Sequence, residues 1–144
     1  MIKILIDNHF EESALINKKN VDLLVKEIFN DYKKSFSSVA FIISNDKKLS
    51  QLKKTFFNKD VLTDVITFNL EEKDQPIEGE IYISLERVID NSKRYKQETF
   101  IELYRVLIHG VLHLIGFDDQ TSIEKKEMTN LENKYLNMIA ATIE

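Results

Sequence analysis

The feature that most constrains the fold is a long, largely apolar segment, residues 98–115, that ends at a glycine. The whole chain has three glycines and one proline, so Gly116 is a rare and informative signal for the end of a helix. One side of the segment is apolar and consists of Leu107, Ile108, Val111, Leu114 and Ile115. The other side is polar, at spacings of three and four, and consists of Glu102, Arg105, His109 and His113. This pattern predicts a helix that packs by one face and presents two histidines on the other.

Shorter elements of both kinds are predicted around this helix. β-Branched and apolar runs indicate strands at residues 2–6, 38–44, 63–70 and 79–85. Helices are predicted at residues 20–34, 46–57, 86–95 and from 121 to about 141. Asn20 is the expected N-cap of the first of these helices, and Thr121 with Glu124 forms a capping box for the last. Without repeats or linkers, residues 1–144 are interpreted as one α+β domain, with a small mixed four-stranded sheet and five to six helices.

Composition limits the class of protein and the metal ligands that it can offer. The 144 residues, 43% hydrophobic and 31% charged, are typical of a globular chain with a real core. Because there is no cysteine, a metal would be held by histidine and carboxylate. No window approaches the roughly 20 apolar residues of a membrane span, and the opening MIKILIDNHF is too short an apolar run for a signal peptide. We expect a soluble, cytoplasmic protein without a membrane partner.

The end of the long helix and the turn after it carry a pattern of metal ligands. Histidines four residues apart on a helix project side by side, so His109 and His113 can face one ion. A chain that folds back after Gly116 places Asp119 to add a carboxylate oxygen. The spacing H-x3-H-x2-G-x2-D matches that of metzincin-type zinc proteases, with aspartate for their third histidine. Three protein ligands leave one position open for water, as in catalytic zinc sites. Asp118 is the alternative third ligand, or a partner of the ligands.

Gly110 separates this pattern from the peptidases. In H-E-x-x-H proteases the glutamate beside the first histidine is the general base. Here that position is Gly110, whose side chain offers no proton acceptor. The sequence therefore predicts the metal ligands without the peptidase base, and a peptidase is the weaker interpretation.

Three motifs together resemble those of one family. HGVLHLIGFDD, at residues 109–119, resembles the HGxLHLxGyDH signature of the YbeY family of metal-dependent rRNA maturation endoribonucleases. KDVLTDVITF resembles the family's KxxPTDVLSF, and GEIYIS resembles its GDIxIS. In this resemblance His109 and His113 match the first two ligands, and Asp119 stands where a third histidine is usual.

The resemblance implies a zincin-like fold with one zinc ion per chain, or another divalent metal. It also implies a single-strand-specific endoribonuclease that acts in 16S rRNA 3′-end maturation and ribosome quality control. The implied partners are ribosomal RNA and the small ribosomal subunit. DNA is not expected as a partner, and the oligomeric state is not indicated. The alternative is a non-catalytic ribosome-assembly binding protein with a structural metal site.

The chain departs from the family pattern just before the TDV motif. The stretch KKTFFNK, residues 53–59, stands where the family usually has NxxYRGK, so that Phe57 takes the place of the arginine. Lys54, Lys59 and Arg105 are the candidates to contact RNA in its place.

The same part of the chain is locally basic, although the net charge of the protein is −4. Residues 46–60 contain five lysines and two acidic residues, and such a local excess is compatible with binding to phosphates. With Phe56 and Phe57 nearby, this segment could also offer a stacking surface. The alternative is a solvated helix face, and we expect the two phenylalanines to be turned into the core.

Asp64, in the TDV motif, has two interpretations. It could brace a ligand histidine through the second ring nitrogen, which is the usual arrangement around a metal. It could equally cap backbone donors at the end of a strand. The last helix is interpreted as packing alone.

Overall fold

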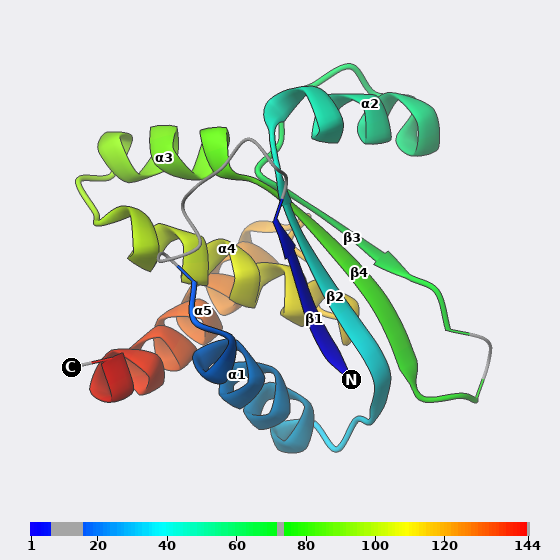
Figure 1. The fold of residues 1–144 in the computed structure, drawn as a ribbon, viewed down its shortest axis with the longest axis vertical. Coiled ribbons are helices and arrows are strands. Elements are labelled where there is room, and N and C mark those ends of the chain that lie inside the picture. Colours follow the sequence, from blue (N-terminus) through cyan, green and yellow to red (C-terminus); the bar gives the residue numbers. More distant parts are fainter. Residues whose placement is uncertain (7–15, 72–73, 144) are drawn as a thin grey trace.

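The computed structural model describes residues 1–6, 16–71 and 74–143, which form four strands and five helices (Figure 1). The strands are β1 (Ile2–Ile6), β2 (Phe36–Ser44), β3 (Val65–Asn69) and β4 (Ile77–Ser84). The helices are α1 (Lys18–Asp31), α2 (Asp46–Phe57), α3 (Leu85–Arg94), α4 (Thr99–Leu114) and α5 (Ser122–Ile143). The predicted α+β class with a mixed four-stranded sheet is confirmed. Within the described ranges, no helix combines the length and the apolar character that crossing a bilayer requires.

The sheet has the strand order β1-β2-β4-β3. β2 runs parallel to both β1 and β4, whereas β3 runs antiparallel to β4. Alternate residues of a strand point to the same face, and on one face these are buried: Val39, Phe41, Ile43, Ile81 and Ile83. Helix α4 packs on this face, and α1 and α5 pack beside α4 on the same side of the sheet (Figure 1). The core therefore lies between the sheet and this group of helices.

Helix α4 approaches the sheet closely because glycines stand at two of the contacts. A Cβ on Gly79 of β4 would lie 2.5 Å from Leu114 Cδ2, and a Cβ on Gly110 of α4 would lie 2.7 Å from Ile81 Cγ2. The Thr67 hydroxyl of β3 donates a hydrogen bond to the carbonyl of Gly110 at 3.1 Å. These contacts fix the second half of α4, which carries both histidines, over β3 and β4.

The ends of the last two helices follow the predicted signals. The backbone N–H of Thr121 donates to Glu124 Oε1 at 2.9 Å, and the N–H of Glu124 donates to Thr121 Oγ1 at 3.1 Å, so the capping box is confirmed. Gly116 follows α4 with a φ of +113°, a conformation that favours glycine, and the helix stops there as predicted.

The predicted start of the first helix was wrong. Its N-cap is Asn17 rather than Asn20, because the Asn17 side chain accepts hydrogen bonds from the backbone N–H groups of Lys19 and Asn20. An asparagine three residues earlier thus already satisfies the free donors of the first turn. Strand β4 likewise begins at Ile77, two residues before the predicted start at residue 79.

Candidate metal centre

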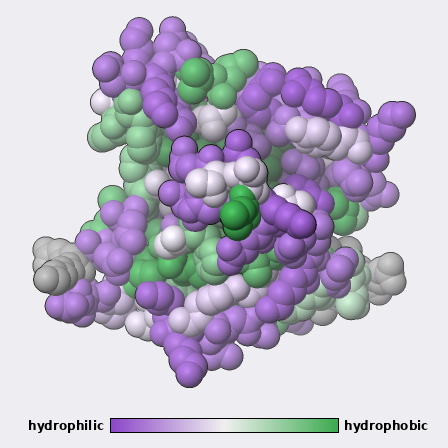
Figure 2. Space-filling model, turned by 180° about the vertical axis from the view of Figure 1, so that it is seen from behind, coloured by the Kyte–Doolittle hydropathy of each residue, from purple (hydrophilic) through white to green (hydrophobic). Residues whose placement is uncertain are grey.

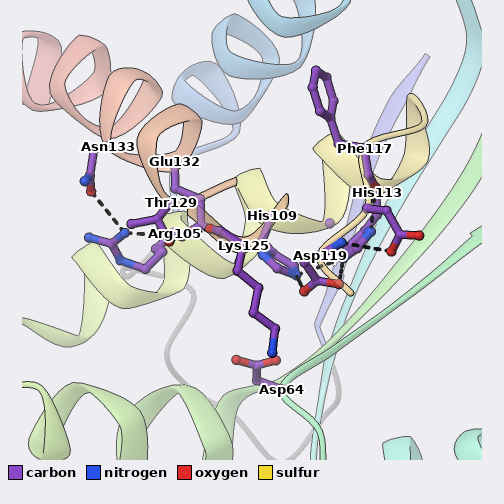
Figure 3. Close-up of polar contacts among 12 residues, drawn as sticks. Asp64, Arg105, His109, His113, Phe117, Asp119, Lys125, Thr129, Glu132 and Asn133 are labelled. Atoms are coloured by element: carbon purple, nitrogen blue, oxygen red, sulfur yellow. Dashed lines mark hydrogen bonds and ion pairs between the residues drawn. The ribbon is translucent and has the colours of Figure 1, made fainter. Parts of the chain in front are cut away.

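The two histidines of α4 lie side by side, and the aspartate after the helix faces both of them (Figure 3). The Nε2 atoms of His109 and His113 are 2.9 Å apart. Asp119 Oδ2 lies 3.3 Å from His109 Nε2, and Asp119 Oδ1 lies 3.5 Å from His113 Nε2. Tetrahedral ligands with bonds of about 2.0–2.1 Å are separated by about 3.3 Å. The three side chains therefore fit one divalent ion of the size of zinc, and they form a group that could hold a metal.

Each imidazole is oriented by a hydrogen bond at its second ring nitrogen. His109 Nδ1 lies 2.6 Å from Glu132 Oε2, and His113 Nδ1 lies 2.9 Å from the carbonyl oxygen of Phe117. A carboxylate or carbonyl at Nδ1 can only accept, so Nδ1 carries the proton and the Nε2 lone pair is directed to the common centre. Two neutral imidazoles and one carboxylate are a donor set that suits zinc.

The geometry of the turn distinguishes the two adjacent aspartates. Asp118 Oδ1 accepts a hydrogen bond from the backbone N–H of Asp119 at 2.8 Å, so this carboxylate stabilises its own turn. Asp119 instead turns both of its oxygens toward the imidazoles. Asp119 is thus the residue that the structure brings to the two histidines.

Glu132 of α5 is the partner of His109, and sequence reasoning missed it. That reasoning offered Asp64 for the role, but the Asp64 carboxylate accepts a hydrogen bond from Asn91 Nδ2 at 3.2 Å. Glu132 is only 7% exposed and lies on a helix face whose other residues are buried apolar groups, namely Met128, Tyr135, Leu136 and Ile139. A buried carboxylate is costly unless it is paired. A glutamate within this apolar stripe was therefore the available signal in the sequence.

A cavity of about 200 Å³ lies behind His109 and contains three carboxylates, those of Asp64, Glu102 and Glu132. Arg105 also lines this cavity. Its Nη1 atom lies 3.3 Å from Glu132 Oε1 and 3.1 Å from Asn133 Oδ1, and its Nε atom lies 3.6 Å from Glu102 Oε1. In Figure 3 Arg105 lies on the other side of His109 from Asp119. Arg105, one of the candidates for RNA contact, thus pairs with carboxylates behind the metal centre.

Burial controls the protonation of this acidic group. Burial raises the pKa of Glu102 to about 7; Arg105 opposes this rise, and the charges of Asp64 and Glu132 add to it. Burial also raises the pKa of Asp64, against the lowering effect of His109. The Glu102 and Asp64 carboxyl groups therefore keep their protons to a higher pH than exposed carboxyl groups do.

The pKa of His109 is shifted in the direction expected for a paired imidazole. Burial alone would lower it, but the hydrogen bond and the charge of Glu132, with the charge of Asp119, raise it above its ordinary value. In the absence of an ion, a proton on His109 can therefore supply the positive charge between the carboxylates of Glu132 and Asp119.

A larger groove of about 480 Å³ opens on the other side of the histidines. Its lining includes His109, His113, Asp119, Asp64 and, from α2, Lys53 and Phe57. Figure 2 shows a face of the molecule that is mainly hydrophilic, with hydrophobic residues visible chiefly toward its middle.

Neither of the two lysines predicted to contact RNA lines this groove. Lys54 and Lys59 are exposed and lie outside its lining, whereas Lys53, which was not singled out from the sequence, is part of it. Lys53 and Lys54 are adjacent on α2 and therefore point in different directions. The sequence alone did not indicate which of the two lines the groove.

The prediction that Phe56 and Phe57 turn into the core was wrong, since they are 64% and 43% exposed. Leu49, in the first half of α2, is the fully buried residue of this helix, whereas the two phenylalanines lie in its exposed last turn. Both phenylalanine rings pack against the ring of Phe68 of β3, and Lys53 Nζ lies 4.8 Å from the centroid of the Phe57 ring.

The fold and the site define an α+β protein with a His-His-Asp group that could hold a metal ion at the wall of an open groove. A family model described as Endoribonuclease YbeY matches residues 5–140, and the chain belongs to this family. The family resemblance predicted from the motifs is confirmed.

Individual relatives agree with this assignment. A protein named Endoribonuclease YbeY from Phocaeicola vulgatus is 37% identical over 125 residues, which cover 87% of this chain and 90% of the relative. A protein of the same name from Amoebophilus asiaticus is 48% identical over 96 residues, which cover 67% of this chain and 65% of the relative. The solution structure of TM1509 from Thermotoga maritima superposes with a TM-score of 0.67 at 31% identity, covering 99% of this chain and 91% of that one.

Proposed function

We propose that this protein is a zinc-dependent endoribonuclease that cuts single-stranded RNA. Family membership supports an endoribonuclease role, because the relatives carry that name. The observation that carries the proposal is the position of the ligand group. His109, His113 and Asp119 form part of the wall of an open groove, where a polymer can reach them.

Gly110 argues against a peptidase on steric grounds as well as chemical ones. A Cβ at this position would lie 2.7 Å from Ile81 Cγ2 and 3.2 Å from Val65 Cγ2, so a glutamate cannot be accommodated without displacing the sheet. Helix α4 therefore packs directly against the sheet at Gly110, the position at which a peptidase carries its general base.

The residues of the chain have separable roles in the proposed reaction. His109, His113 and Asp119 would hold a divalent ion, which when bound would supply Lewis acidity toward a phosphoryl oxygen and lower the pKa of a water molecule. Glu132 holds the His109 ring in the orientation that directs Nε2 to the ion. Asp64 lines both the groove and the cavity behind it, and its raised pKa suits a carboxylate that accepts a proton from the attacking water. Lys53, at the groove, is placed to contact a phosphate.

The finer part of the proposal concerns the biological substrate. We infer a role in 16S rRNA 3′-end maturation and ribosome quality control in the cytoplasm, with ribosomal RNA and the small ribosomal subunit as partners. The family resemblance of the three motifs supports this inference. The alternative, a non-catalytic assembly factor with a structural metal, is favoured by Phe57 in the place of the family's arginine.

The decisive experiment compares the wild type with His113→Ala on a single-stranded RNA, with zinc supplied. We expect the wild type to cleave the RNA. The cleavage rate of His113→Ala should fall by more than the roughly 10- to 100-fold that is typical when only the hydrogen-bond partner of a metal ligand is removed. Both proteins should bind small ribosomal subunits equally. Equal behaviour of the two proteins in the nuclease assay would support the non-catalytic alternative, and cleavage of an unstructured peptide would restore the peptidase interpretation.

A further inference from the structure

We propose that Phe57 is a stacking platform for one nucleobase of the RNA substrate, next to the metal centre. This inference rests on the proposed endoribonuclease function and adds a specific substrate subsite to it. Phe57 is the last residue of α2, and its 43% exposed side chain lines the same groove as His109, His113 and Asp119. An aromatic ring beside a phosphodiester-cleaving centre is well placed to hold the base that flanks the cut.

The end of α2 fixes this ring in its position. Asn58, the C-cap, has a φ of +53° and ends the helix immediately after Phe57, and its backbone N–H donates to the carbonyl of Lys53. The Phe57 ring lies 5.9 Å from the ring of Phe68 and is tilted by 30° to it. The ring is thus supported by Phe68 of β3, while much of its surface stays accessible to solvent.

The ring is covered in part by a cation that a base can replace. Lys53 Nζ lies 4.8 Å from the centroid of the Phe57 ring. An exposed contact of this type strengthens an interaction only about 2- to 5-fold, whereas stacking of one base on an aromatic side chain strengthens binding about 5- to 150-fold. A base is therefore expected to displace the ammonium group from the ring. Lys53 is then free to pair with the adjacent phosphate, so one helix turn supplies both contacts.

The neighbouring ring of Phe56 provides a natural comparison. Phe56 is more exposed, at 64%, and it packs edge-on against Phe68 with centroids 5.3 Å apart, but it is not part of the groove lining. Val61 and Leu62 are exposed as well. Exposed apolar groups in general favour a protein contact. Among these four residues, Phe57 is the one that lines the groove together with the metal ligands. A nucleobase is therefore a better occupant of this position than a protein.

The test uses the absence of tryptophan from the chain. Phe57→Trp and Phe56→Trp each introduce a single fluorophore, and both are titrated with a single-stranded oligoribonucleotide of about 10 residues, in EDTA so that the RNA is not cut. Stacking predicts strong quenching of the fluorophore in Phe57→Trp and little change in Phe56→Trp. Equal quenching in both variants, or none in either while the wild type binds the RNA, would overturn the proposal.

Affinity measurements separate stacking from other roles of this residue. We expect Phe57→Ala to weaken oligoribonucleotide binding about 5- to 150-fold, and Phe57→Trp to restore it. Phe56→Ala, which removes a ring that does not line the groove, should change the affinity little. An oligonucleotide that lacks its bases should bind equally to the wild type and to Phe57→Ala. A loss of affinity for this abasic strand would show that Phe57 acts through the shape of the groove instead.

The outcomes for the subsite and for the enzyme are distinguishable. If the wild type cuts RNA with zinc while Phe57→Ala binds RNA normally, the endoribonuclease proposal stands and the stacking proposal is wrong. If the wild type neither binds nor cuts RNA, both are wrong. If the two Phe57 variants lose only the binding of a ribosomal protein, this ring belongs to a protein-docking surface.

Discussion

Glu102 is predicted to destabilise the folded protein at neutral and alkaline pH. It lies in the first turn of α4, is 3% exposed, and shares a cavity with Asp64 and Glu132. Burial and these two carboxylates raise its pKa from the ordinary 4.5 to about 7, although Arg105 lies 3.6 Å away. The substitution Glu102→Gln keeps the size of the side chain and removes its titration.

The sign of the effect follows from the direction of the pKa shift. Above about pH 4.5 the unfolded chain loses the Glu102 proton, while the folded protein keeps it until about pH 7. The free energy of unfolding therefore falls as the pH rises from about 4.5 to 7, and Glu102 contributes no further change above that. The rise in pKa from 4.5 to about 7 corresponds to about 3 kcal/mol, at roughly 1.4 kcal/mol per pH unit.

Urea denaturation followed by circular dichroism, between pH 4.5 and 8.5 in EDTA, measures this contribution. The free energy of unfolding of Glu102→Gln should be close to that of the wild type at the lowest pH and higher by up to about 3 kcal/mol at pH 8. Glu127→Gln, on an exposed position of α5, is the matched control and should show no such trend. A difference between Glu102→Gln and wild type that stays constant with pH, or that is largest at low pH, would refute the reasoning.

Three further predictions concern the metal centre and its packing. Asp119→Asn should weaken zinc affinity, measured by competition with a chelator, whereas Asp118→Asn, which keeps its turn acceptor, should change that affinity little; the reverse order would make Asp118 the ligand. Glu132→Ala should weaken zinc affinity about 10- to 100-fold, and Glu132→Gln less, because an amide oxygen can still accept from the imidazole. Gly110→Ala should lower the free energy of unfolding by up to about 2 kcal/mol, because overpacking against Ile81 (about 1–3 kcal/mol) is offset in part by the gain of about 1 kcal/mol in helix propensity. A stabilised Gly110→Ala protein would show that the helix can withdraw from the sheet at no cost.

The part of the site that could be predicted from sequence is the part that is local in the chain. His109 and His113 share a helix, and Asp119 follows the glycine that ends it, so helix geometry and turn chemistry suffice to bring them together. Glu132 lies on another helix, 23 residues away from the histidine it contacts. Its role depends on how α4 and α5 pack, which spacing alone does not contain.

The fold was predictable for a similar reason, and the errors have physical causes. Capping residues and the glycine after α4 act within one turn, so the capping box and the helix end were predicted correctly. Phe57 was misplaced because an aromatic residue in a helix is usually core, whereas the structure leaves the last turn of α2, which carries Phe57, largely exposed. Which of several neighbouring lysines lines the groove likewise depends on how α2 packs against the rest of the protein.

The two hydrogen bonds that orient the imidazoles connect the ion to different parts of the chain. His113 is held by a carbonyl of its own turn, whereas His109 is held from α5, a helix that contributes no ligand. Ion binding and the docking of this C-terminal helix are therefore thermodynamically linked. Loading with zinc should slow amide exchange along α5, although this helix provides no ligand, and truncation of α5 before Glu132 should release the ion from a centre whose three ligands are all still present.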